Sequence, residues 1–322
     1  MNRDGQPGAA PALIAARHGV AAENVRPMLS GVANRAYRLG PDLVLRVPRT
    51  EEFVADLVKE AAVIPVARAA GVRTPALVAF DDSRTVVDVP YMVLERAPGV
   101  DLASLGGGAG GVVSDASREV GGVFRDVGRD LARLHRVTPA GAGEPARVPV
   151  EYDPDAGAPH RLVEGLLADG MLDAEAARWL GGWFGRLAER IPDGVSHVLV
   201  HGDIAPQNLL VTPGPPGPLT LTGIVDWGDA MWADPAVEFA KTPLSGVPAM
   251  LDGYREGGAA DGGEYAFEAR VLRYHLTWAL ARLRNPAPVP GERHWTAPPA
   301  ARLLGILRFF ASSPPAPWAA LV

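Results

Sequence analysis

Two segments of the sequence combine acidic and amide side chains at a spacing that suits phosphoryl transfer. The first, HVLVHGDIAPQN, spans residues 197–208 and places Asp203 five residues before Asn208. Phosphoryl transfer needs a group that orients a hydroxyl and accepts its proton, and oxygen ligands that hold Mg²⁺ against the phosphates. Asp203 could be that base, and the Asn208 oxygen one of the ligands. Asp and Asn also favour turns for structural reasons, so this spacing alone is a weak signal.

The second segment strengthens this interpretation, because another apolar run ends at an acid. TGIVDWGD, residues 222–229, places Asp226 before an aromatic residue and a glycine, as in the Asp-Phe-Gly element of protein kinases. In that element the aspartate binds magnesium. Residues 212–218, between the two segments, are rich in proline and glycine, which predicts a turn. Such a turn can bring Asp203, Asn208 and Asp226 to one cleft.

Short apolar runs should place these acids at strand ends. Residues 198–200 are β-branched and aliphatic, which predicts a buried strand that stops just before Asp203. Residues 209–211 start a second strand directly after Asn208. Upstream, the chain is predicted to form strands and an amphipathic helix at residues 51–70. The upstream strands are expected at residues 26–29, 36–39, 43–47, 76–80, 85–89 and 90–95.

HGDIAPQN, followed by GIVDWGDAMWADPAVEFA, resembles the motifs of the aminoglycoside and macrolide phosphotransferases. These are small-molecule kinases with a protein-kinase-like fold. The resemblance extends from about residue 13 to 285. It implies an α+β fold with two lobes, a nucleotide-binding lobe with a small β-sheet at residues 1–95 and a mostly helical lobe at residues 96–322. The second lobe would carry the catalytic residues and the acceptor site.

The resemblance also implies roles for individual residues. Asp203 would be the catalytic base, Asn208 and Asp226 the Mg²⁺ ligands, and ATP or GTP the phosphoryl donor. A turn in the first lobe lies where the family has its loop over the nucleotide phosphates, although it contains a single glycine and could be an ordinary hairpin turn. Backbone groups at the end of the strand at residues 90–95 would bond the purine. The nucleotide-binding residues implied here are Ser30, Gly31 and Asn34 in the turn, and Leu94, Glu95 and Arg96 at the strand end.

Arg46 departs from the family pattern. Alternation along residues 43–47 puts Leu45 and Val47 on one face of the strand and Arg46 on the other. The family has a phosphate-binding lysine at this place, and arginine can bind phosphate through two nitrogens but is larger and not equivalent. Glu60, on the helix at residues 51–70, would pair with Arg46 and fix it toward the phosphates. An exposed strand arginine and a free surface glutamate are the alternatives.

Composition limits the class of protein. The chain has 322 residues, of which 48% are hydrophobic, with a mean hydropathy of +0.06, which suits a globular core. A net charge of −6 argues against a nucleic acid as partner. No apolar run has membrane-spanning length, so no membrane partner is expected, and an ATP-dependent enzyme would be cytoplasmic. The absence of cysteine excludes disulfides and thiol catalysis.

The acceptor is expected to be a small molecule with a hydroxyl group. Residues 151–185 hold seven acids and two arginines, and residues 252–268 hold five acids and one arginine. Acidic helices at a cleft would attract a cationic acceptor, although charge runs are often only solvated faces. An aminoglycoside antibiotic is therefore expected first. The alternatives are a macrolide or other antibiotic, a metabolic alcohol such as an amino alcohol, sugar or nucleoside, and a nucleotide-binding module without catalysis.

Three other polar residues are expected to be structural. His201 should brace the loop through hydrogen bonds, because the expected chemistry needs no imidazole. His135, at the end of a core helix, should be packed or cap that helix. Asp234, followed by a proline, should cap a helix start.

Overall fold

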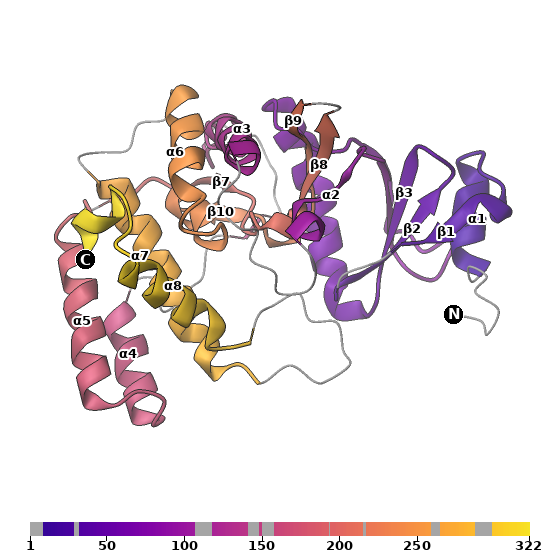
Figure 1. Ribbon diagram of the computed structural model, residues 1–322. Coiled ribbons are helices and arrows are strands. Elements are labelled where there is room, and N and C mark those ends of the chain that lie inside the picture. Colours follow the sequence, from indigo (N-terminus) through magenta and orange to yellow (C-terminus); the bar gives the residue numbers. More distant parts are fainter. Residues whose placement is uncertain are drawn as a thin grey trace.

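The computed structural model describes residues 9–28, 32–106, 118–140, 148–149, 158–192, 194–214, 217–258, 265–286 and 298–322. The first part of the chain forms an antiparallel sheet of five strands in the order β1-β2-β3-β5-β4, at the indigo end of the molecule (Figure 1). The strands are β1 (Val25–Pro27), β2 (Asn34–Leu39), β3 (Leu43–Pro48), β4 (Leu77–Asp81) and β5 (Tyr91–Glu95).

The strand predicted at residues 85–89 is wrong. β4 ends at Asp81, whose carboxylate accepts hydrogen bonds from the backbone and hydroxyl of Ser83 at 2.9 and 2.6 Å and so begins a turn. β5 then returns directly beside β4, which leaves residues 82–90 as their connection. Val87 is buried there. Its apolar side chain therefore produced the strand pattern without any backbone pairing.

One helix covers each face of the sheet. α1 (Ala9–Arg17) packs Ile14 against Leu45 and Val93, on the face turned away from the rest of the molecule (Figure 1). α2 (Val54–Ala69) covers the opposite face, which carries Arg46. The alternation predicted for residues 43–47 is therefore confirmed: Leu45 and Val47 are buried on one face, and Arg46 lies on the other.

The second part of the chain is mostly helical, with two small sheets. β7 pairs with β10, and β6, β8 and β9 form a three-stranded sheet. The helices and strands are α3 (Arg118–Leu134), α4 (Pro159–Ala168), α5 (Ala174–Ala188), α6 (Val247–Glu256), α7 (Ala266–Ala281), α8 (Ala301–Ala311), β6 (Val100–Asp101), β7 (Val198–Val200), β8 (Leu209–Gly214), β9 (Gly217–Ile224) and β10 (Met231–Ala233). Short 3-10 helices are η1 (Ala22–Asn24), η2 (Glu51–Phe53), η3 (Leu102–Gly106), η4 (Pro206–Asn208), η5 (Trp227–Asp229), η6 (Pro235–Lys241), η7 (Arg282–Arg284) and η8 (Trp318–Leu321).

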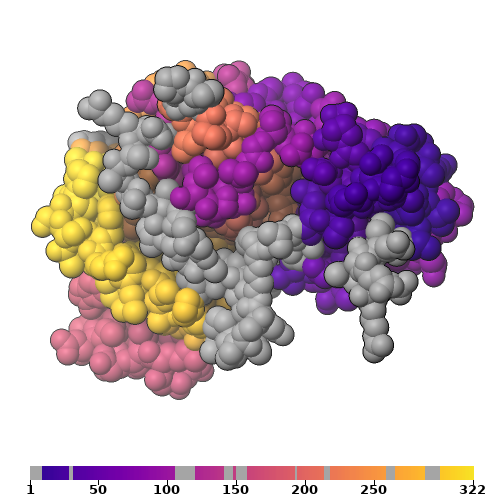
Figure 2. Space-filling view, turned by 45° about the vertical axis from the view of Figure 1, so that its right-hand side comes forward, coloured from indigo at the N-terminus to yellow at the C-terminus, as the bar shows by residue number. Residues whose placement is uncertain are grey.

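The main hydrophobic cluster joins the two parts of the chain. It begins with Leu57 and Ile64 of α2 and extends through α3 to the C-terminal residues. The C-terminal segment lies at the opposite end of the molecule from the sheet (Figure 2). It is held to α5 by a 2.9 Å hydrogen bond from the Trp183 Nε1 to the Leu321 carbonyl. Among the described residues, no helix combines the length and apolar character needed to cross a bilayer.

Candidate active site

The loop after β7 is fixed by a buried histidine. The His201 Nδ1 accepts the N–H of Asp203 at 3.1 Å, so its Nε2 carries the proton and donates to the Val225 carbonyl at 3.1 Å. Burial lowers the pKa of His201, which keeps the ring neutral and suits this arrangement. His201 thus ties the Asp203 loop to the segment before Asp226. The bracing role predicted for it is confirmed.

Asp203 and Asn208 are held together across this loop. The Asn208 Nδ2 donates to the Asp203 carbonyl at 2.9 Å and to its carboxylate Oδ2 at 2.7 Å. β8 starts directly after Asn208, and its antiparallel register with β9 pairs Leu209 with Ile224. A 3.0 Å bond from the Val225 N–H to the Asn208 carbonyl completes the connection. The end of β9 therefore brings Asp226 to the same end of the hairpin as Asn208.

A buried acid, Glu238, contacts the loop that carries Asp203. Its Oε1 accepts the N–H of Gly202 at 2.7 Å, and its Oε2 has no partner among the described residues. Burial raises the pKa of Glu238 to about 7, although backbone N–H groups oppose the shift. Gly202 itself has a φ of +81°, and a Cβ there would lie 2.3 Å from the Asp229 carbonyl oxygen. Only glycine fits this position without displacing the loop.

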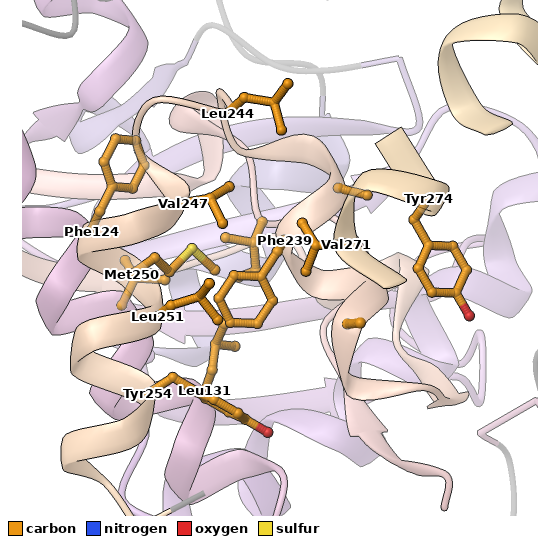
Figure 3. Packing of buried hydrophobic residues seen from close by; sticks show 14 of the residues in the cluster. Phe124, Leu131, Phe239, Leu244, Val247, Met250, Leu251, Tyr254, Val271 and Tyr274 are labelled. Carbon is orange, nitrogen blue, oxygen red and sulfur yellow. The ribbon is translucent and has the colours of Figure 1, made fainter. Parts of the chain in front are cut away.

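The short helix η6 carries Glu238, and its position follows from core packing. Phe239 points into a cluster formed by Val247, Met250 and Leu251 of α6 and Val271 of α7 (Figure 3). Because Phe239 is fixed there, its neighbours along η6 are fixed as well.

The start of η6 is capped as the sequence predicted. Asp234 accepts the N–H of Ala236 at 2.9 Å and also binds the Arg270 Nη1 at 2.9 Å. His135 is packed, as expected: its Nδ1 lies 2.8 Å from the Tyr254 hydroxyl, and burial lowers its pKa to about 3. Neither residue contacts Asp203.

Lys241, at the end of η6, was missed by sequence reasoning. Its Nζ lies 2.8 Å from the Asp203 Oδ1 and 3.2 Å from the Asp229 Oδ2, and 4.2 Å from the centre of the Trp278 ring. Lys241 is one of the two lysines in an arginine-rich chain. That rarity was a signal that could have drawn attention to it. The Asp203 carboxylate is thus held by Asn208 on one oxygen and by Lys241 on the other.

Arg46 connects the sheet, α2 and the segment after β9. Its Nη2 lies 2.7 Å from the Asp226 Oδ1, and its Nη1 bonds the Glu60 Oε1. The side chains of Arg46 and Glu60 are only 14% and 1% exposed, so both solvent-exposed alternatives are wrong. Burial alone would lower the pKa of Arg46, but the two carboxylates outweigh it and raise that pKa. Glu60 also accepts the Trp227 N–H at 3.2 Å, which fixes the position of Asp226.

The charge of Arg46 acts in turn on Asp226. Burial opposes ionisation of this carboxyl group, but Arg46, together with Lys241, holds its pKa below the usual value. Asp226 has a φ of +74°, a left-handed conformation that is uncommon outside glycine. An ionised, fixed carboxylate is the kind of oxygen ligand that Mg²⁺ takes. The Asn208 amide oxygen, which accepts no hydrogen bond from the described residues, is a second such ligand.

The described residues contain no group of three or more His, Cys, Asp or Glu side chains suited to a metal. This agrees with a site of one amide and one carboxylate, because Mg²⁺ commonly binds one or two protein oxygens, with phosphates and water completing its shell. Asn208 and Asp226 therefore fit an ion that is bound together with a nucleotide.

The other residues predicted to bind the nucleotide lie, where the structure describes them, at the start of β2 and the end of β5. Ser30 and Gly31 fall outside the described residues. Asn34 starts β2, and its buried Oδ1 has no partner among the described residues. The N–H groups of Glu95 and Arg96 already donate to the Ala76 and Asp42 carbonyls at 2.9 and 2.7 Å. A purine at the end of β5, next to Leu94, would therefore compete with these bonds or use neighbouring backbone groups.

Many acids that suggested a cationic acceptor are engaged elsewhere. Glu151, Asp153, Asp155, Asp261 and Glu264 fall outside the described residues. Five of the others have these partners: Asp169 with Arg284, Asp173 with the Ala176 N–H, Asp252 with Arg125, Glu256 with Arg129 and Glu268 with Arg255, all within 3.0 Å. These five therefore do not form an unopposed acidic surface toward Asp203.

Fold and site together describe a two-lobed, kinase-like α+β protein. The chain belongs to the APH phosphotransferase enzyme family, whose model matches residues 24–275. Comparison with curated protein sequences gives no match. The expected family and fold class are confirmed. The lobe boundary at residue 95 stays a prediction.

Solved structures show the same fold at low sequence identity. Aminoglycoside 2'-phosphotransferase-IIIa in complex with GDP has a TM-score of 0.63 and 20% identity, covering 90% of this chain and 93% of that chain. A macrolide 2'-phosphotransferase from Brachybacterium faecium has a TM-score of 0.60 and 22% identity, with 86% and 92% covered. A choline/ethanolamine kinase family protein from Mesorhizobium loti has a TM-score of 0.57 and 21% identity, with 92% and 90% covered.

Proposed function

We propose that this phosphotransferase moves the γ-phosphoryl group of ATP or GTP to a hydroxyl group of a small molecule, with Mg²⁺. One observation carries the proposal: the hydrogen bonds of His201 and the β8–β9 register bring Asp203, Asn208 and Asp226 to one place. A base and two magnesium ligands then lie beside an arginine fixed by Glu60. Such positioning is most of what phosphoryl transfer requires.

In this proposal each side chain has a defined task. Asp203 orients the acceptor hydroxyl and takes its proton while the oxygen bonds to the γ-phosphorus and the bond to the nucleoside diphosphate breaks. Asn208 and Asp226 hold Mg²⁺, which neutralises charge on the phosphates when bound. Arg46 supplies positive charge to the phosphate side, and Glu60 holds its guanidinium in place.

The nucleotide assignment has support in the similar structures. The aminoglycoside 2'-phosphotransferase-IIIa structure is a GDP complex, and another similar structure, of APH(2")-IIa at 15% identity, contains ATP and streptomycin. Both ATP and GTP are therefore candidate donors for this chain. We place the reaction in the cytoplasm, where these nucleotides are made.

Similar proteins also narrow the acceptor. Their names include aminoglycoside and macrolide phosphotransferases, which favours an antibiotic as acceptor and resistance as the role. The choline/ethanolamine kinase family protein keeps a metabolic alcohol as the second candidate. The charge argument for a cationic acceptor is weak, because five of its acids are paired elsewhere.

Mass spectrometry of reaction mixtures tests the proposal. The protein is incubated with Mg²⁺, with ATP or GTP, and with a panel of aminoglycosides, macrolides, amino alcohols and sugars. The expected result is one compound that gains the mass of a single phosphoryl group. Asp203→Ala should abolish that product while nucleotide still binds, and Asp82→Ala, a change at an exposed acid of the β4–β5 connection, should leave it unchanged. A fully active Asp203→Ala variant would overturn the assignment.

A further inference from the structure

Arg302, in the first turn of α8, is a cation with no carboxylate within ion-pair distance among the described residues. Its Nε is buried without a hydrogen-bond partner, and among the described residues its guanidinium forms neither an ion pair nor a hydrogen bond. The contact it makes is with Trp278, whose ring centre lies 5.3 Å from the Arg302 Cζ. Arg302 as a whole is half-buried, and a cation partly withdrawn from water is normally paired, because an unpaired one loses hydration without compensation. The lack of a partner therefore needs an explanation.

Arg302 lies close to the catalytic loop. The Trp278 ring that it contacts also contacts Lys241, the residue that bonds Asp203 at 2.8 Å. Burial and, to a smaller extent, the charge of Arg282 lower the pKa of Arg302 to about 10, although Asp203 opposes both. Arg302 thus stays positively charged at neutral pH and lies within electrostatic range of Asp203.

The two cations beside Trp278 differ in their partners. Lys241 is balanced by Asp203 and Asp229, whereas Arg302 has no carboxylate within ion-pair distance among the described residues. An ammonium group placed near Arg302 would be repelled by it and by Arg282. A carboxylate or phosphate placed there would instead gain a charged hydrogen-bond donor and the aromatic face of Trp278.

We infer that Arg302 and Trp278 form an acceptor subsite for an anionic group, so that the preferred acceptor carries a carboxylate or phosphate as well as the hydroxyl placed at Asp203. This inference rests on the proposed function. It replaces the cationic acceptor expected from the sequence with an anionic one. This subsite is separate from the place where the donor phosphates would bind. That place is at Arg46 on β3, which bonds Glu60 and Asp226.

Inorganic phosphate is the probe for this subsite. Calorimetry measures its binding to the protein saturated with Mg²⁺ and a non-hydrolysable nucleotide, so that the donor site is filled. Wild type should bind phosphate, and Arg302→Gln should weaken that binding at least tenfold, while Arg302→Lys keeps part of it. Arg308→Gln, an exposed position on the same helix, is the matched control and should bind as wild type does. No phosphate binding by wild type, or equal binding by Arg302→Gln, would overturn the inference.

A second arm separates this inference from the proposed function. Glucose, glucosamine, glucuronate and glucose 6-phosphate share one ring and differ in charge, and they are offered with ATP or GTP beside kanamycin and erythromycin. Transfer to glucuronate or glucose 6-phosphate, reduced at least tenfold in Arg302→Gln, supports both proposals. Transfer only to cationic or neutral compounds, without competition by phosphate, removes the anionic subsite and keeps the kinase. Absence of any nucleotide binding removes the kinase itself.

Discussion

Two clusters in this molecule have the same composition, one cation shared by two carboxylates, but only the first includes a fully buried carboxylate. They are Glu60–Arg46–Asp226 and Asp203–Lys241–Asp229. In the first, Glu60 is 1%, Arg46 14% and Asp226 49% exposed, and the three residues come from α2, the sheet and the segment after β9. In the second, Lys241 is 15%, Asp203 22% and Asp229 58% exposed.

This difference separates a fixed scaffold from an open site. Removing a partner from a buried ion pair leaves a charge without compensation, so the Arg46–Glu60 pair should keep one arrangement. Exposed ion pairs contribute little and exchange partners easily. The Lys241–Asp229 pair, with Asp229 58% exposed, can therefore open toward an incoming acceptor. We expect changes in the first cluster to affect nucleotide binding and changes in the second to affect transfer.

The largest effect should separate the two clusters directly. Asp203→Ala and Asp226→Ala should each lower turnover about 10³-fold, the size expected from loss of a catalytic acid–base group or a metal site. Only Asp226→Ala should also weaken binding of the Mg²⁺ nucleotide, by about tenfold, because one charged contact contributes about 1.4 kcal/mol or more. Steady-state rates and nucleotide titration by calorimetry give the two values. Equal nucleotide affinity in both variants would contradict the division of roles.

Gly202→Ala should displace the Asp203–Lys241–Asp229 cluster and leave the Glu60–Arg46–Asp226 cluster unchanged. The new Cβ would lie 2.3 Å from the Asp229 carbonyl oxygen, in a backbone at φ +81°. The left-handed conformation costs about 1–2 kcal/mol for alanine, and displacement of the loop by about 1 Å can lower turnover about 100-fold. Nucleotide affinity should stay unchanged. Turnover and nucleotide binding are measured side by side.

Gly194→Ala is the matched control for this change. Gly194 has a φ of +76°, and a Cβ there meets no atom of the described residues within 4 Å. The variant should therefore show the conformational cost in its unfolding free energy and keep its turnover. A loss of turnover equal to that of Gly202→Ala would mean that the contact with Asp229 is unimportant.

Sequence reasoning reached the residues that lie at strand ends. Asp203, Asn208 and Asp226 could be expected to meet, because short apolar runs with fixed spacing and a turn between them define the hairpin register. The Arg46–Glu60 pair followed in the same way from alternation on a strand and from the position of a helix. These are local patterns, and each is encoded within about twenty neighbouring residues.

The remaining residues of the site reach it through long-range packing. Lys241 and Glu238 are placed by the insertion of Phe239 between α6 and α7, and Arg302 by the packing of α8 against α7. No local pattern marks such contacts. The strand predicted at residues 85–89 is absent for a related reason. Val87 is apolar because it is buried in the core, and not because the segment pairs with another strand.

Lys241→Met tests the member of the open cluster that sequence reasoning missed. Loss of a charged hydrogen bond costs about 1.5–3 kcal/mol, so turnover should fall about 10- to 100-fold, less than for Asp203→Ala. Lys241→Arg should recover part of the rate because it restores the charge next to Asp203. Asp229→Asn should change turnover less than about threefold, since its side chain is 58% exposed. An Asp229→Asn effect as large as that of Lys241→Met would mean that Asp229, and not Asp203, is the partner that matters.

The smallest expected effect concerns stability and compares the buried acids beneath the two clusters. Burial raises the pKa of both acids to about 7, but Glu60 bonds Arg46, whose charge opposes the shift, whereas Glu238 is held by backbone N–H groups. Folding therefore favours protonated Glu238. The stability that this protonated group contributes to the folded protein is complete below its unfolded pKa and is lost as pH rises through about 7.

The glutamine of Glu238→Gln cannot ionise. The unfolding free energy of this variant minus that of wild type should therefore rise by up to about 3 kcal/mol between pH 4.5 and 8. The glutamine amide can still accept from Gly202, and any cost of its extra N–H groups is the same at every pH. The slope of the difference, from urea unfolding at several pH values, is thus the quantity to measure. Glu60→Gln removes a carboxylate bonded to Arg46 and should instead lower stability at pH 8. A difference for Glu238→Gln that does not change with pH would mean that this carboxyl group is ionised in the folded protein.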